Sequence, residues 1–267
     1  VEVAIVFVYD APFLMASQYS SATYGKDKFE IDSNLRGSPL ELVACETVDL
    51  LVPANAEIVL EGKIVPGKRE LEGPFGELMG YYGAQAPHPI IEVSCVLHRN
   101  NPIYQTAFPC REEHVSNGLI REVELYYHLK NQLDVVDVNV TEGGGYRFNA
   151  FVSIRKQREG DGKTAILAAL GLNKDLKHVV IVDDDVDIFD LQDIEWAITT
   201  RSQASMDYVI VEGALGSSLE PSHDLRGVTD KLGIDATKPL KDKNGKFSRA
   251  IIPNYDKIEI SRYFPNI

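Results

Sequence analysis

The amino-acid sequence predicts an α/β protein, α+β in the stricter sense, because two different patterns of predicted secondary structure follow one another along the chain. Residues 40–108 hold β-branched runs separated by turn residues, which is typical of a barrel or an antiparallel sheet. From residue 135 onward, strand and helix patterns alternate, as in an α/β layer. A helix predicted over 112–132 separates the β-rich segment from the alternating one, so we expect one domain over residues 1–115 and a second over 116–267.

The first elements form a small α/β piece. Residues 1–9 are a β-branched run typical of a buried strand, 11–18 favour a short helix, and 26–35 favour a helix that Gly37 ends. The given sequence begins within this predicted strand and has no initiator Met. We therefore expect either a fragment or a subunit whose missing half is supplied elsewhere.

The β-rich segment predicts four strands, over 40–45, 57–64, 89–98 and 103–107. The helix that follows offers an apolar stripe, which we expect to face the core. Its members are Leu119, Ile120, Val123, Tyr126, Tyr127 and Leu133.

The C-terminal half predicts strands over 135–140, 148–154 and 178–182, and helices over 163–170 and 191–199. The three glycines at 143–145 lack the lysine and serine of a phosphate loop, so they indicate a turn. Beyond Thr237, the lysines and prolines predict a tail that wraps over a neighbouring surface or frays.

Composition narrows the class of protein. The chain has 267 residues, 44% of them hydrophobic and 25% charged, which is enough to bury a substantial core. A net charge of -13 disfavours a nucleic-acid partner or an anionic membrane surface. No apolar run is long enough to insert stably into a membrane, and the three cysteines show no metal-binding spacing. These features predict a cytoplasmic protein whose partners are small molecules or other subunits.

The segment from Glu72 to Glu77 is the most informative for chemistry. Two glycines and a proline force a tight path, which can present both carboxylates to one cavity. Two acids in different environments can have different pKa values, so that one stays ionised while the other acts as a proton donor. A solvent-exposed acidic turn explains the same spacing, and spacing alone leaves this alternative open.

The acidic run at 183–187 does not have the spacing of a calcium loop, because Ile188 stands where an EF-hand needs glycine. It indicates instead the end of a strand before a helix, whose backbone N–H groups Asp190 or Asp193 would cap. The six histidines show no pair at metal-binding spacing.

Seven segments stand out as motifs: Cys45-Glu46-Thr47, residues 52–62, Glu72–Glu77, 183–187, Trp196-Ala197, Thr200-Arg201 and 231–237. In order and spacing they resemble those of UbiD-type decarboxylases, which use prenylated FMN to remove carbon dioxide from unsaturated or aromatic acids, or to add it. The resemblance extends from about residue 3 to residue 239. It implies a split-barrel-like flavin-binding domain followed by an α/β domain for oligomerisation, in a homo-oligomer such as a dimer or hexamer.

The resemblance also implies roles for individual residues. It makes Glu77 the proton donor to the decarboxylated carbon and Glu72 the partner that orients a catalytic arginine. Leu78 falls on a position that lines the substrate pocket. Lys231 falls on a position that contacts the flavin phosphate, a role that suits a compact ammonium group.

The resemblance is incomplete around the metal. The family holds a divalent ion, Mn or Mg, together with K, but the matching arginine, asparagine and histidine belong to sequence upstream of Val1. The remaining ligand is a glutamate, and Lys28 stands at its position. Glu30 could substitute as a ligand, or the Lys28 ammonium could replace the charge of the cation.

The sequence therefore predicts reversible, non-oxidative decarboxylation of an aromatic or α,β-unsaturated carboxylic acid, with that acid and CO2 as the small-molecule partners. A non-catalytic scaffold subunit of a UbiD-like complex and a reductase that binds unmodified FMN are the alternatives. Neither alternative needs two carboxylates in a constrained turn, so Glu72 and Glu77 favour the enzyme. The sequence does not specify the acid or the direction of the reaction.

Overall fold

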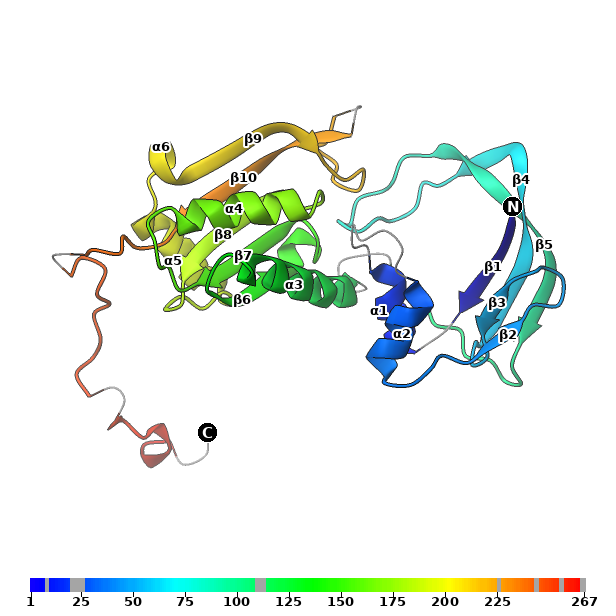
Figure 1. Ribbon diagram of the computed structural model, residues 1–267, viewed down its shortest axis with the longest axis horizontal. Helices are drawn as coiled ribbons and strands as arrows, with labels where there is room; N and C mark the ends of the chain where they lie inside the picture. The colour runs from blue at the N-terminus through cyan, green and yellow to red at the C-terminus, as the bar shows by residue number, and fades with distance from the viewer. Residues whose placement is uncertain are drawn as a thin grey trace.

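The computed structural model describes residues 1–7, 10–19, 27–108, 114–224, 227–242, 245–254 and 257–264. Figure 1 shows two lobes: one holds β1 to β5 with α1 and α2, and the other holds β6 to β10 with α3 to α6. The order of elements confirms the mixed α/β class. None of the helices in these ranges is long and apolar enough to cross a membrane.

The N-terminal lobe is built on a three-stranded antiparallel sheet. Its strand order is β1–β4–β5, with β1 at Glu2–Phe7, β4 at Ile58–Glu72 and β5 at Ala86–His98. A separate pair, β2 (Leu42–Ala44) and β3 (Leu51–Pro53), lies beside it. No closed barrel forms among the described strands, and the split barrel stays a prediction.

Two described helices complete this lobe, and the second ends at the predicted glycine. Helix α1 spans Ala11–Gln18, and α2 spans Lys28–Arg36. Asp27 caps α2 by accepting a hydrogen bond from the backbone N–H of Phe29 at 2.9 Å. Gly37 ends α2 with a φ of 71°, a left-handed conformation that favours glycine.

The C-terminal lobe is a five-stranded sheet with strand order β6–β7–β8–β10–β9. The central strands β7, β8 and β10 are parallel, and the two edge strands run antiparallel to their neighbours. The bounds of the strands are β6 Val135–Val140, β7 Asn149–Ile154, β8 His178–Asp183, β9 Tyr208–Leu215 and β10 Val228–Ala236.

Helices cover both faces of this sheet (Figure 1). The core beside α3 (Val115–Lys130) and α4 (Asp161–Leu172) contains Val179 and Ile181 of β8. The core beside α5 (Leu191–Arg201) contains Val180 and Val182 of the same strand. Because successive side chains point to opposite faces, a strand covered on both sides has an uninterrupted apolar run. The short α6 (Ala204–Asp207) precedes β9.

Three expectations differ from the structure. Residues 103–107 form no strand, while β3, β9 and β10 are additional strands. The predicted stripe on α3 is wrong in part, because Leu119, Val123 and Tyr127 are exposed. The helix packs through Leu125 and Leu129 instead, since only that face meets the sheet.

Candidate active site

The segment that links β4 to β5, residues 73–85, begins directly after Glu72 and carries Glu77, the two predicted catalytic residues. Gly73 and Gly80 take φ angles of 86° and 77°, so the tight path does require glycine. The loop is closed by hydrogen bonds from the Glu77 N–H to the Tyr81 carbonyl at 2.8 Å and from the Gly83 N–H to the Phe75 carbonyl at 2.9 Å. These bonds hold the glutamate backbone in one conformation.

Glu77 is half-buried, and its side chain lies directly against Gly83. A β-carbon added at Gly83 would be 3.1 Å from the Cγ and 3.2 Å from the Oε1 of Glu77. Both distances are shorter than ordinary van der Waals contacts. Gly83 therefore provides the space that the carboxyl group of Glu77 occupies.

Glu72 ends β4 and has an exposed side chain, 58% accessible. Its Oε2 lies 3.8 Å from the Nδ1 of His88 on β5. The two glutamates therefore lie at the end of β4 and in the loop that follows it, and they have different surroundings, one exposed and one half-buried. Two carboxyl groups need different surroundings if one is to donate a proton while the other stays ionised.

Leu78 and Met79 join the tip of this loop to the C-terminal lobe. Leu78 is only 2% exposed. A β-carbon at Gly145, just after the one-turn 3-10 helix η2 (Glu142–Gly144), would be 2.7 Å from the Met79 sulfur and 3.2 Å from the Leu78 Cγ. The turn predicted from the three glycines is confirmed, and it is the surface against which the loop packs.

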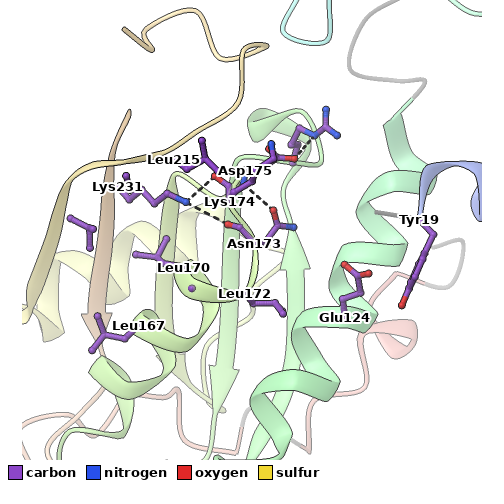
Figure 2. Close-up of a pocket in the computed structure, with 14 residues that line it drawn as sticks. Tyr19, Glu124, Leu167, Leu170, Leu172, Asn173, Lys174, Asp175, Leu215 and Lys231 are labelled. Atoms are coloured by element: carbon purple, nitrogen blue, oxygen red, sulfur yellow. Dashed lines mark hydrogen bonds and ion pairs between the residues drawn. The ribbon is translucent and has the colours of Figure 1, made fainter. Parts of the chain in front are cut away.

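Lys231 lies on β10 and lines a cavity of about 950 Å³ in the C-terminal lobe (Figure 2). The residue is 4% exposed, and its ammonium donates to the carbonyl oxygen of Lys174 at 2.8 Å. Burial lowers the pKa of Lys231, while the nearby charge of Asp175 raises it. Lys231 is therefore a buried cation that faces a cavity rather than a solvated surface lysine.

The same cavity contains functional candidates that the sequence did not single out. Arg147 and Lys174 line it, and both contact the carboxylate of Asp175. The only signal in the sequence was that Arg147 follows a glycine turn and Lys174 precedes a strand. Neither position marks a binding residue until the fold brings them beside Lys231.

The predicted metal position is occupied by Lys28, the first residue of α2. Its ammonium donates a hydrogen bond to the Ser17 carbonyl at 2.5 Å, which ties α2 to α1. Within the described ranges, no three His, Cys, Asp or Glu side chains lie close enough to share a metal ion. The described residues alone thus do not fit a divalent cation.

The acidic run at 183–187 is structural. Asp183 and Asp185 bind the guanidinium of Arg201, at distances from 2.8 to 2.9 Å. Asp190 caps α5 by accepting from the backbone N–H of Gln192 at 2.9 Å, as predicted. These acids join β8 to α5 and leave no open calcium loop.

Comparison with known protein families covers nearly the whole chain. Residues 1–112 match the 3-octaprenyl-4-hydroxybenzoate carboxy-lyase Rift-related domain, named UbiD. Residues 114–236 match the C-terminal domain of the same carboxy-lyases. The boundary between the two matches falls at the start of α3.

Similar proteins include several decarboxylases. The anhydromevalonate phosphate decarboxylase of Methanothermobacter thermautotrophicus is 43% identical over 93% of this chain and 58% of its own length. The phenolic acid decarboxylase of Bacillus subtilis is 34% identical over 90% of this chain and 52% of its own length. The chain thus spans a little over half the length of these relatives.

Among solved structures, the UbiD-class enzyme HmfF from Pelotomaculum thermopropionicum, in complex with FMN, superposes with a TM-score of 0.90 and 47% identity. The superposition covers 98% of this chain and 59% of HmfF. An evolved dimeric form of HmfF, in complex with prFMN, gives a TM-score of 0.85 at 44% identity, over 98% of this chain and 57% of that one. Sequence, domain order and fold agree, and the chain belongs to the UbiD family of carboxy-lyases.

Proposed function

We propose that this chain forms part of a decarboxylase that acts, reversibly and without oxidation, on an aromatic or α,β-unsaturated carboxylic acid with prenylated FMN. The observation that carries this proposal is the contrast between Glu72, exposed at the end of β4, and Glu77, half-buried in the loop at 73–85 that follows it. The decarboxylases among its relatives support the reaction class. The proposed reactants are that acid and CO2.

In this proposal Glu77 donates the proton to the carbon that has lost carbon dioxide. Its half-buried carboxyl group is held by a closed loop and confined by Gly83, so its position is defined before substrate arrives. Glu72 is the exposed partner, free to turn toward an arginine supplied from outside this chain. Leu78 would contribute an apolar surface at the edge of the substrate pocket.

Prenylated FMN, when bound, supplies an electron sink for the carbanion that decarboxylation leaves. The residues fit the phosphate of such a group, because Lys231 is a buried ammonium beside a cavity and Arg147 lines the same cavity. We propose that Lys231 contacts the flavin phosphate. A divalent metal does not fit the described residues, so no step is assigned to one.

Assembly is part of the proposal. The relatives include a dimeric form of HmfF, and a vanillic acid decarboxylase of Sedimentibacter hydroxybenzoicus, ShVdcCD, that is 30% identical. We propose that the C-terminal lobe mediates homo-oligomerisation, or association with a subunit that supplies the catalytic arginine. The exposed side chain of Glu72 is available for such a contact.

The proton-donor role is tested with Glu77→Gln in protein co-expressed with a prenyl-flavin synthase, as the chain alone and in its longest natural form. The amide keeps the size of the carboxyl group but cannot donate its proton. We expect turnover and solvent-deuterium exchange at the reacting carbon to be lost while flavin stays bound. Normal exchange in the variant would contradict the role of Glu77. Protein that never retains flavin would favour the scaffold subunit instead.

A further inference from the structure

The two edges of the five-stranded sheet in the C-terminal lobe are built differently. Strand β6 forms one edge and β9 the other, and β9 is the outermost strand of this lobe in Figure 1. An edge strand presents backbone N–H and C=O groups to which a further strand can add. Natural sheets protect such edges with charged side chains, prolines, bulges or a covering helix.

The β6 edge is protected. The backbone N–H of Val140 donates to the carboxylate of Glu122 on α3 at 2.9 Å, and the N–H of Val138 donates to the carboxylate of Asp137 at 2.8 Å. Helix α3 also packs against β6. Side-chain carboxylates therefore occupy the N–H groups that an added strand would need at this edge.

The β9 edge has few of these protections. Its sequence over Tyr208–Leu215 contains neither lysine nor proline, and among the described strands it is hydrogen-bonded to β10 alone. Gly213 takes a φ of 63° next to a shift in the register with β10. Such a bulge twists a strand out of line, so the part that can accept another strand is residues 208–212, the open edge.

Ile210 lies at the centre of the open edge, and its backbone faces outward. It is opposite Leu232 of β10, whose N–H donates to the Lys177 carbonyl on the β8 side at 2.8 Å. Directly opposed residues of an antiparallel pair either exchange both hydrogen bonds or face away from each other. Since Leu232 faces β8, the Ile210 N–H and C=O face away from β10. Among the described residues, no side chain bonds to them.

We infer that β9 pairs antiparallel with β9 of a second copy of this chain, about a two-fold axis at Ile210. The Ile210 N–H of each copy then donates to the Ile210 carbonyl of the other, and the two sheets become one. A two-fold axis presents the same edge twice, so donors and acceptors match without a second kind of surface. This pairing deepens the assembly proposed above for the C-terminal lobe and rests on that proposal.

Apolar side chains beside the open edge favour the same partner. Ile210 is 66% exposed, Met206 of α6 is 65% exposed, and Leu215 at the end of β9 is 62% exposed. A stable interface buries roughly 800 Å² on each partner, more than one short strand provides. Met206 and Leu215 therefore belong to the contact, and pairing removes their apolar surface from water together with that of Ile210.

The test is sedimentation velocity over a range of concentrations, for the chain and for its longest natural form. Ile210→Pro removes only an outward N–H, so the bonds between β9 and β10 stay. Ile210→Lys keeps the N–H but places a charge in the contact. We expect each variant to raise the dissociation constant of the pair at least about tenfold, which halves the mass of the assembly at intermediate concentrations. Leu119→Lys, at a 50% exposed leucine on α3, is the matched control and should assemble like the parent.

Hydrogen exchange, followed by mass spectrometry, locates the contact. We expect the amides of residues 208–212 to exchange more slowly as the concentration of the parent rises, and this dependence to be lost in Ile210→Lys. The fluorescence of Trp196 on unfolding verifies that each variant is folded. A parent that stays monomeric, assembly that both Ile210 variants leave intact, or loss of assembly in Leu119→Lys alone would overturn the pairing. Neither readout depends on flavin or turnover, so such a failure leaves the role of Glu77 untouched.

Discussion

The buried contact between β8 and α5 leads to a sharp stability prediction for Arg201→Met. The side chain of Arg201 is fully buried, and its guanidinium donates to Asp183 Oδ2 at 2.9 Å and to both oxygens of Asp185 at 2.9 and 2.8 Å. Methionine is close in volume to the arginine stem but has no charge. The substitution therefore removes the cation and leaves two carboxylates in the site.

The magnitude follows from this geometry. Removing one partner of a buried ion pair costs about 3–5 kcal/mol, because the other partner stays buried without compensation. We expect the lower end, about 3 kcal/mol, because Lys238 also contacts both acids, through its backbone N–H and its ammonium. With a urea m-value of about 2 kcal/mol/M, the unfolding midpoint falls by about 1.5 M.

Urea unfolding followed by fluorescence is a suitable assay, because Trp196 is the single tryptophan and lies on α5. Arg155→Met is the matched control. Arg155 also binds the acidic run, through Asp184 at 3.0 Å, but it is 55% exposed, so we expect a loss below about 1 kcal/mol. A loss below about 1 kcal/mol in Arg201→Met, or equal losses in the two variants, would refute the reasoning.

Three further predictions concern the candidate loop and acid stability. In Gly83→Ala the new methyl displaces the Glu77 carboxyl, so turnover should fall about threefold to tenfold with flavin content unchanged; unchanged turnover would contradict this positioning. Gly145→Ala strains a φ of 64° and presses on the Met79 sulfur, so chemical denaturation should show a loss of about 1–3 kcal/mol. Burial alone would raise the pKa of Asp185, but its hydrogen bonds and ion pairs with Arg201 and Lys238 lower it to about 2, well below the ordinary range of an aspartate. The folded state thus binds fewer protons than the unfolded state at acid pH. About 1 kcal/mol of unfolding free energy, present above pH 4, is therefore lost as the pH falls toward 2. In Asp185→Asn the unfolding free energy should lack this dependence on pH.

The loop at 73–85 links the packing of the two lobes. The loop belongs to the N-terminal lobe, but its tip packs on Gly145 of the C-terminal lobe through Leu78 and Met79. A hydrogen bond from the Ser116 hydroxyl to the Gln18 side chain, at 2.5 Å, joins α3 to the end of α1. Substitutions at either contact are therefore expected to affect Glu77 without touching it.

Much of the fold could be predicted because local signals were strong. Gly37 marked the end of α2, Asp190 was one of the two acids expected to cap α5, and the apolar run at 178–182 predicted the strand that became β8. These features depend on backbone preferences and on side-chain periodicity, which a short stretch of sequence contains in full. The paired glutamates were also visible, because two glycines and a proline between them restrict the backbone.

Other features depend on packing between distant segments. Strand β10 was missed because Asp230, Lys231 and Asp235 interrupt its apolar pattern, and only the fold supplies partners for these charges. The packing face of α3 was ambiguous, since apolar residues occupy more than one side and only the sheet selects Leu125 and Leu129.

By itself, the sequence determined the α/β class, most of the helices and strands, and the segment from Glu72 to Glu77, because each rests on local patterns. Only the tertiary structure decided that Gly83 makes room for Glu77 and that Leu78 packs between the lobes. The cationic cavity also arises only in three dimensions. The charged residues of this cavity come from separate parts of the chain. Only folding sets the distances between them, and these distances decide whether the charges repel or pair.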